Sequence, residues 1–202
     1  LLAGAALLSA PLAAQDEAGK DKQDEKWDVE APKGATIRQV PIKTSEGTWM
    51  DVDVSPDGQT IAFTLLGDIY TMPITGGTPT RVAEGLAWEV QPRFSPDGRR
   101  IAFTSDRGGA DNIWVMNTDG SDKRQVTKED FRLLNQPTWS PDGRFIVAKK
   151  HFTTGRSLGT GELWMYHVSG GGGVQLTERP NPQHQKELGE PVFAPDGSAV
   201  YF

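Results

Sequence analysis

Four aspartates recur in register along the chain, and carboxylates in register are a pattern that can build a metal site. Each stands third in a four-residue unit, and the units follow one another at spacings of 40, 45 and 54 residues: Asp57, Asp97, Asp142 and Asp196. Three units read Ser-Pro-Asp-Gly and the last reads Ala-Pro-Asp-Gly. Turns favour Asp for backbone reasons, because its side chain bonds nearby amides. We therefore expect four turns here, not a ring of metal ligands.

Other residue types that carry chemistry are few. His151, His167 and His184 are the three histidines, and they form neither a His-x-His nor a His-Glu-x-x-His pattern. The chain has no Gly-x-Ser-x-Gly nucleophile elbow. It also has no cysteine, which excludes a Cys-ligated zinc and a Cys nucleophile from this segment. The sequence predicts no catalytic residue, no cofactor and no metal ligand within these residues.

One long connection is the candidate binding loop. Residues 149–161 separate two expected strands and include His151, Arg156 and Ser157. Long loops on a rigid sheet often carry binding residues. The alternative interpretation is a solvated hairpin extension made flexible by its glycines.

The four turns also define the fold. A type I turn accepts Ser, Pro, Asp and Gly in this order, and alternating apolar residues flank each unit, as in a hairpin. A third strand follows in each complete repeat, at residues 68–72, 112–116 and 162–166, and a short fourth strand comes after a Gly-rich turn. Four strands in a repeat of this length are typical of a β-propeller blade.

The expected organisation is therefore all-β. Residues 31–202 are predicted to form propeller blades, at about 48–85, 88–128, 134–178 and from about 190 onward. The six tryptophans recur at blade positions or near the N-terminus and are expected to pack between blades: Trp27, Trp49, Trp88, Trp114, Trp139 and Trp164. Propellers close with about four to eight blades. Because three blades and part of a fourth cannot close, we expect the natural protein to continue beyond Phe202.

The N-terminal residues have a different composition. Residues 1–14 are apolar and small, which is typical of the remnant of a secretory signal peptide, with a core helix as the alternative. The run is too short to span a bilayer, so we expect no membrane-spanning segment. Residues 15–30 are highly polar and are predicted to be a disordered linker. Residues 31–49 are expected to form one or two extended strands. Such a strand could be the outer strand that closes the ring against the last blade.

Net charge limits the partners. The chain carries a formal charge of −6, and binding to nucleic-acid phosphates requires a basic surface. We therefore expect no nucleic-acid partner. A secreted or periplasmic location agrees with the N-terminal pattern.

The repeat resembles that of a known family. The unit apolar-x-x-Ser-Pro-Asp-Gly-x-x-Ile-Ala-Phe-Thr-Ser, followed by Asn-Ile-Trp-Val-Met-Asn-x-Asp-Gly, is similar to the TolB-type propeller repeat. This repeat occurs in the periplasmic TolB protein, in prolyl-oligopeptidase-type peptidases and in large secreted bacterial amidohydrolases. A repeat of this kind indicates fold more strongly than function.

Finer segments resemble the amidohydrolase group, among them residues 47–50, 65–73, 128–134 and 150–178. That resemblance implies an accessory propeller before a metal-dependent hydrolase domain, with a divalent metal, zinc, in the downstream domain and that domain as the propeller's partner. The propeller itself would control substrate access or bind a peptide or protein ligand. The alternatives are a TolB-like binding scaffold without enzymatic activity, and the propeller of a serine peptidase.

Overall fold

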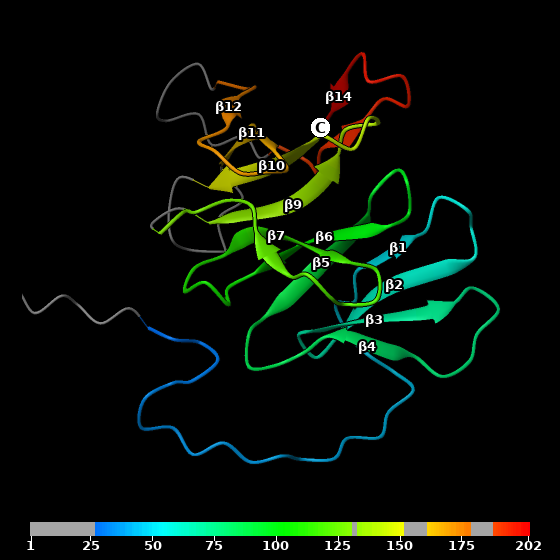
Figure 1. Cartoon of the computed structure of the whole chain (residues 1–202), viewed down its shortest axis with the longest axis vertical. Helices are drawn as coiled ribbons and strands as arrows, with labels where there is room; N and C mark the ends of the chain where they lie inside the picture. Colours follow the sequence, from blue (N-terminus) through cyan, green and yellow to red (C-terminus); the bar gives the residue numbers. More distant parts are fainter. Residues whose placement is uncertain (1–26, 131–132, 152–160, 179–187) are drawn as a thin grey trace, which may run out of the picture.

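The fold is a stack of antiparallel sheets, as expected from the repeated turns. A computed structural model of the chain describes residues 27–130, 133–151, 161–178 and 188–202. Three sheets have four strands each and a fourth sheet has two, and the strand order in each complete sheet follows the chain (Figure 1). No helix occurs among these residues, and thus none that could cross a membrane. The predicted all-β class and its propeller-type blades are confirmed.

The strand bounds agree closely with the predicted repeats. Blade one comprises β1 (Val52–Val54), β2 (Thr60–Leu65), β3 (Asp68–Pro73) and β4 (Thr80–Ala83). Blade two comprises β5 (Glu89–Phe94), β6 (Arg100–Ser105), β7 (Asn112–Asn117) and β8 (Arg124–Gln125). Blade three comprises β9 (Leu134–Trp139), β10 (Phe145–His151), β11 (Gly161–His167) and β12 (Val174–Gln175). The fourth sheet pairs β13 (Val192–Phe193) with β14 (Val200–Tyr201).

Each Ser-Pro-Asp-Gly unit forms the expected turn between the first two strands of its blade. In blade two the Gly98 amide donates to the Ser95 carbonyl at 2.8 Å, and Gly98 has φ +68°. The Ser95 hydroxyl donates to Asp97 Oδ1 at 2.6 Å and accepts the Arg100 amide at 2.9 Å. The same hydroxyl contacts recur in blades one and three. The turn aspartates therefore serve the backbone, as the sequence predicts.

Replacing Ser95 with alanine is expected to lower the free energy of unfolding by about 1–3 kcal/mol, because it leaves the partly buried Arg100 backbone amide without its acceptor. Ser95 is fully buried. Its hydroxyl is also the main reason that the pKa of Asp97 lies below its ordinary value. Stability from this lowered pKa is present above the unfolded-state pKa and is lost as the pH falls through the folded-state pKa.

Urea unfolding of the Ser95→Ala variant measures this effect, and Ser198→Ala is the matched control. In the fourth turn Ala194 replaces the serine, and the exposed Ser198 hydroxyl bonds Asp196 instead, at 2.7 Å. The control should change stability by less than about 0.5 kcal/mol. Equal losses in the two variants would contradict the role assigned to the buried hydroxyl.

Packing between blades supplies the core. Strand residues of blade two alternate between two clusters, because successive side chains of a strand point to opposite faces. Ile101 and Phe103 pack toward blade one, whereas Ala102 packs toward blade three. One cluster joins blades one and two, and the other joins blades two and three. Each blade is thus stabilised by its neighbours.

The tryptophans differ from the expectation that all pack between blades. Trp139 is buried, and Trp114 and Trp164 pack against the two core clusters. Trp27, Trp49 and Trp88 are 61%, 98% and 47% exposed, so their predicted burial is wrong. Trp27 and Trp49 precede β1 and belong to none of the four sheets.

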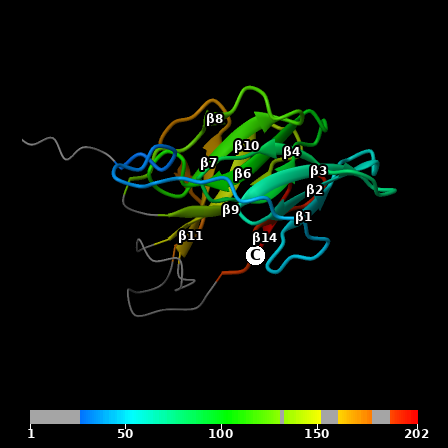
Figure 2. The same ribbon diagram turned by 90° about the horizontal axis from the view of Figure 1, so that it is seen from below.

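The N-terminal segment also differs from its prediction. Residues 27–50, here called the strap, contain no strand and run along the outside of the sheets (Figures 1 and 2). The expected strands in residues 31–49 are absent, because this segment pairs with no sheet edge of the described residues and its Ile37, Val40 and Ile42 stay exposed. Glu30, assigned to the linker, is hydrogen-bonded to the blades. Residues 1–26 lie outside the described residues, so the leader prediction stays a prediction.

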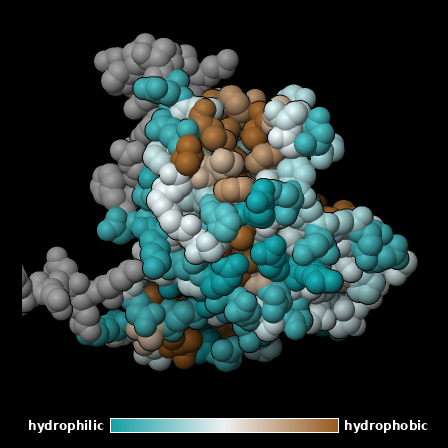
Figure 3. Space-filling view, turned by 45° about the horizontal axis from the view of Figure 1, so that its top comes forward, coloured by the Kyte–Doolittle hydropathy of each residue, from teal (hydrophilic) through white to brown (hydrophobic). Residues whose placement is uncertain are grey.

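The surface is uneven in polarity. Figure 3 shows hydrophobic side chains gathered in the upper part of that view, with a mostly hydrophilic surface below. The two-stranded sheet leaves Val192, Tyr201 and Phe202 more than half exposed.

Candidate functional site

The first strands of the sheets lie side by side and present a common polar surface. Strands β1, β5, β9 and β13 contact one another in this order. The pairing of β5 with β6 and of β9 with β10 each includes an irregularity of register. Gln91 and Gln136 stand at these bulges with φ of +57° and +56°. A bulge redirects a side chain away from the regular alternation, so both glutamines are placed to reach the neighbouring blade.

These side chains form a chain of hydrogen bonds from blade to blade. The Gln91 backbone amide donates to Asp51 Oδ2 at 3.3 Å, and the Gln136 backbone amide donates to Gln91 Oε1 at 2.8 Å. The Gln136 side chain in turn donates to Glu190 Oε1 at 3.2 Å. One residue of each blade thus contacts the residue at the same position of the next blade. The first strands of the sheets, β1, β5, β9 and β13, here called the inner strands, therefore share one polar network.

Charge on this surface is mainly negative. Burial raises the pKa of Asp51 and of Asp53, while backbone amides and Arg93 oppose the rise. Arg93 Nη2 lies 3.4 Å from Glu190 Oε2. Asp53, Arg93 and Glu190 help to line a cavity of about 340 Å³ between the inner strands. Three carboxylates around one guanidinium suit the binding of a polar or cationic segment of a peptide.

The predicted binding loop is only partly described. Strand β10 extends to His151, and β11 begins at Gly161, so residues 149–151 belong to the sheet and not to the loop. His151 is 3% exposed, and its Nε2 lies 3.1 Å from Asn135 Oδ1. Arg156 and Ser157 lie outside the described residues, and the binding role of the loop stays a prediction. Within the described ranges, no group of three or more His, Cys, Asp or Glu residues is placed to hold a metal ion.

Sequence reasoning missed the inner-strand network, although a signal for it exists. A Gln-Pro or Glu-Pro pair precedes the turn by a fixed distance in three repeats, at Gln91, Gln136 and Glu190. Proline has no amide to donate to a ladder and is typical of bulges and edges. The recurrence of an amide or carboxylate before it indicates a polar position repeated from blade to blade.

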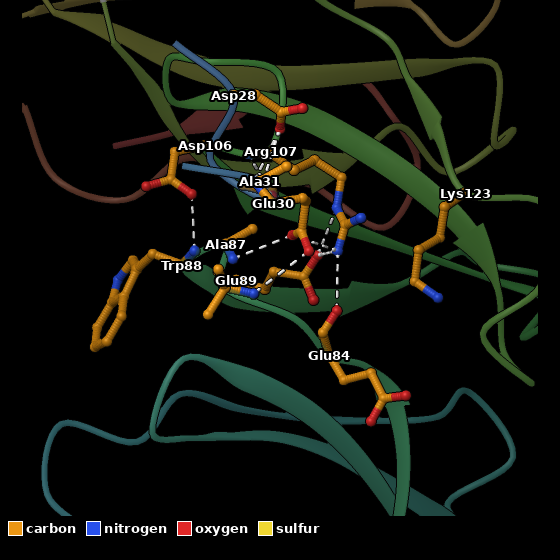
Figure 4. Close-up of polar contacts among 12 residues, drawn as sticks. Asp28, Glu30, Ala31, Glu84, Ala87, Trp88, Glu89, Asp106, Arg107 and Lys123 are labelled. Atoms are coloured by element: carbon orange, nitrogen blue, oxygen red, sulfur yellow. Dashed lines mark hydrogen bonds and ion pairs between the residues drawn. The ribbon is translucent and has the colours of Figure 1, made fainter. Parts of the chain in front are cut away.

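A second polar cluster lies at the junction of blades one and two. Glu89 begins β5 with no exposed surface, and its Oε1 accepts bonds from Arg107 Nε and Nη2 at 2.8 and 2.5 Å (Figure 4). Burial raises the pKa of Glu89 to about 7, against the lowering effect of Arg107. Glu30 of the strap reaches the same junction. This cluster ties the strap to the blades.

The turns, the four-stranded blades and the network of inner strands together match one known domain type. The family described as the TolB beta propeller domain matches residues 33–202. The chain belongs to this family. The predicted TolB-type resemblance is thereby confirmed, whereas its amidohydrolase refinement stays a prediction.

Relatives of this TolB-type propeller include enzymes. The chain is 29% identical over 195 residues to an uncharacterized peptidase, YuxL, of Bacillus subtilis, covering 75% of this chain and 29% of the peptidase. It is 33% identical over 92 residues to a Tricorn protease homolog of Streptomyces coelicolor, covering 46% of this chain and 9% of that protein. The chain thus spans less than a third of the length of these two relatives.

Solved structures show the same fold at lower identity. A candidate TolB from Agrobacterium tumefaciens has a TM-score of 0.63 at 24% identity, covering 78% of this chain and 59% of that one. TolB from Acinetobacter baumannii has a TM-score of 0.55 at 24% identity, covering 74% of this chain and 36% of that one. These likenesses support the propeller architecture.

Proposed function

We propose that this TolB-type propeller is the accessory domain of an extracytoplasmic hydrolase, and that the hydrolase is a peptidase. The observation that carries the proposal is the match to a Bacillus peptidase, which extends over 75% of this chain and over 29% of the peptidase. Under this proposal the catalytic domain lies in a part of the protein outside these residues. The apolar residues 1–14 and the likeness to TolB structures support the extracytoplasmic location.

The inner-strand surface supports a role in admitting or orienting peptides. Asp51, Asp53 and Glu190 surround Arg93 beside the cavity of about 340 Å³. The carboxylates are partly desolvated, as their raised pKa values indicate for Asp51 and Asp53. Charges in a partly enclosed surface act on a ligand more strongly than charges in open solvent.

An amidohydrolase is the second candidate, because segments such as residues 47–50 and 128–134 resemble that group. It would use a divalent metal, zinc, in the downstream domain to activate a water molecule. A scaffold without enzymatic activity is the third. The three differ in the chemistry of the protein outside these residues, so one experiment on the intact protein distinguishes them.

The intact protein, expressed from its natural gene, is expected to hydrolyse peptides and to react with a fluorophosphonate probe at one serine. Loss of activity with a metal chelator, restored by zinc, together with no reaction of the probe, would favour the amidohydrolase. If neither hydrolysis nor labelling is observed, the scaffold without enzymatic activity is the remaining candidate.

The accessory role of the propeller is tested separately, with variants of the inner-strand surface. Arg93→Ala should change KM for peptides with charged residues by about threefold and leave kcat unchanged. The control Arg99→Ala, at an exposed arginine, should change neither.

A further inference from the structure

The loop between β4 and β5 presents backbone amides to a single point outside the sheets. The Ala87 amide donates to Glu30 Oε1 at 3.1 Å, and the Leu86 amide donates to Glu30 Oε2 at 3.4 Å (Figure 4). Successive amides that point toward one place form a concavity for an anion. The loop therefore offers two donors, one to each oxygen of a carboxylate.

Arg107 adds a fixed positive charge to this concavity. Its Nη2 lies 3.7 Å from Glu30 Oε1. The same Nη2 also donates to the buried Glu89 carboxylate and to the Glu84 carbonyl, the latter at 3.3 Å, and Nε donates to Glu89 as well. The position of Arg107 is thus set by the blades and not by the strap. A preorganised guanidinium and two amides are a recognition set for a carboxylate.

Glycine at position 85 gives the carboxylate its room. Gly85 has φ +139°, a conformation that other residues rarely adopt. A Cβ atom at this position would overlap both oxygens of Glu30. The backbone of the loop and the carboxylate can therefore approach only because no side chain intervenes. The niche is defined by Gly85, Leu86, Ala87 and Arg107.

The occupant belongs to a segment with few other anchors. Glu30 lies 56 residues before Leu86, and Asp28 caps its turn by accepting the amides of Glu30 and Ala31. Residues 33–50 of the strap are exposed and form no strand. Glu30 is thus a side chain presented by a bend of the strap to a site that the blades build on their own.

We propose that this niche is a carboxylate-binding site for acidic peptides, which Glu30 fills in cis and a second acidic peptide fills in trans when the strap is released. The ligand class follows from the occupant: a side-chain carboxylate on a bent segment that lies outside the sheets. The proposal holds whichever catalytic domain the whole protein carries, so its failure would leave the proposed function untouched.

The test uses a fluorescein-labelled peptide that copies residues 27–34, titrated onto the intact protein and followed by fluorescence anisotropy. We expect at least about tenfold tighter binding to the Glu30→Gln variant than to the wild-type protein, because a tethered carboxylate competes at an effective concentration of about millimolar. A peptide with Gln in place of Glu30 should bind the variant at least about tenfold more weakly, since it loses the charge-assisted bonds. Glu46→Gln, in the exposed part of the strap, should behave as wild type.

Hydrogen exchange gives an independent readout on the niche itself. The Leu86 and Ala87 amides should exchange about tenfold faster in Glu30→Gln, and saturating peptide should restore their protection. Equal affinity of the two peptides, equal affinity of the two proteins, or exchange at these amides that ignores both variant and peptide would overturn the proposal. Because the substitution removes only a charge at the surface, the variant is expected to fold normally.

Discussion

Replacing Arg107 with alanine is expected to lower the free energy of unfolding by about 3–5 kcal/mol at a pH of about 8. Removing one partner of a buried ion pair leaves the other charge uncompensated, and this costs more than the pair itself contributes. Glu89 has no exposed surface. Among the described residues, Arg107 is the only side chain that donates hydrogen bonds to Oε1 of Glu89. The other carboxylate oxygen of Glu89, Oε2, has no hydrogen-bond partner among the described residues. The variant therefore leaves a buried carboxylate without a donor.

The loss should depend on pH in a defined direction. Burial raises the pKa of Glu89 to about 7 despite Arg107, with a smaller lowering effect of Lys123 and a raising effect of Glu30. A carboxyl group with a raised folded-state pKa favours folding below its unfolded-state pKa, and that contribution is lost as the pH rises through the folded-state value. Without Arg107 the pKa rises further, so the variant's deficit should be smaller at a pH of about 5 than at about 8.

Urea unfolding of wild type and Arg107→Ala at these two pH values measures the effect. Arg99→Ala is the matched control, because Arg99 is an exposed arginine of the same blade, and it should change stability by less than about 0.5 kcal/mol at either pH. Adding Glu89→Gln to Arg107→Ala should remove the pH dependence by replacing the titrating group with a neutral amide. A deficit that is the same at both pH values would contradict the role of Glu89.

Comparison of equivalent positions shows why this ion pair escaped sequence reasoning. Glu89 stands six residues before its turn serine, at the position that Leu134 occupies in blade three. Leu134 is fully buried, and so is Glu89. The alternation of apolar and polar residues predicts an exposed side chain for a glutamate. Alignment of the repeats predicts a buried side chain at position 89, because Leu134 is the equivalent residue. A charged residue at a leucine position would have indicated a buried pair, but the sequence alone does not name Arg107 as its partner.

The local parts of the fold were predictable because they depend on short-range chemistry. The turn at Ser95 follows from four adjacent residues, and the strands follow from alternation on either side of it. The exposure of Trp49 and the path of the strap were not predictable, because no local pattern shows where the segment before β1 runs over the blades. Glu30 likewise meets Ala87 only through the stacking of blades one and two. The inner-strand network is intermediate, since its Gln-Pro pairs repeat in the sequence while their partners do not.

We expect a second large loss of stability at Gly120, where blade two packs against blade one. This residue ends the turn after β7, has φ +86°, and donates its amide to the Asn117 carbonyl at 2.9 Å. A Cβ atom there would overlap the carbonyl oxygen of Val82, in the outer strand of blade one. Because this neighbour is backbone, it cannot rotate away as a side chain can. Gly120→Ala is expected to lower the free energy of unfolding by about 3 kcal/mol, from backbone strain and from overpacking together.

Two further glycines separate these two causes. Gly76 occupies the corresponding turn of blade one, with φ +89° and nothing within 4 Å of an added Cβ, so Gly76→Ala measures the backbone strain alone, about 1–2 kcal/mol. Gly170 of blade three has φ +105° and would place a Cβ 3.5 Å from the Val126 carbonyl, an ordinary contact. Thermal or urea unfolding should therefore rank the losses as Gly120→Ala first, with Gly170→Ala close to Gly76→Ala. Equal losses at Gly120 and Gly76 would show that the turn of blade two does not bear on blade one, and that the stability of the stack resides in the strand cores instead.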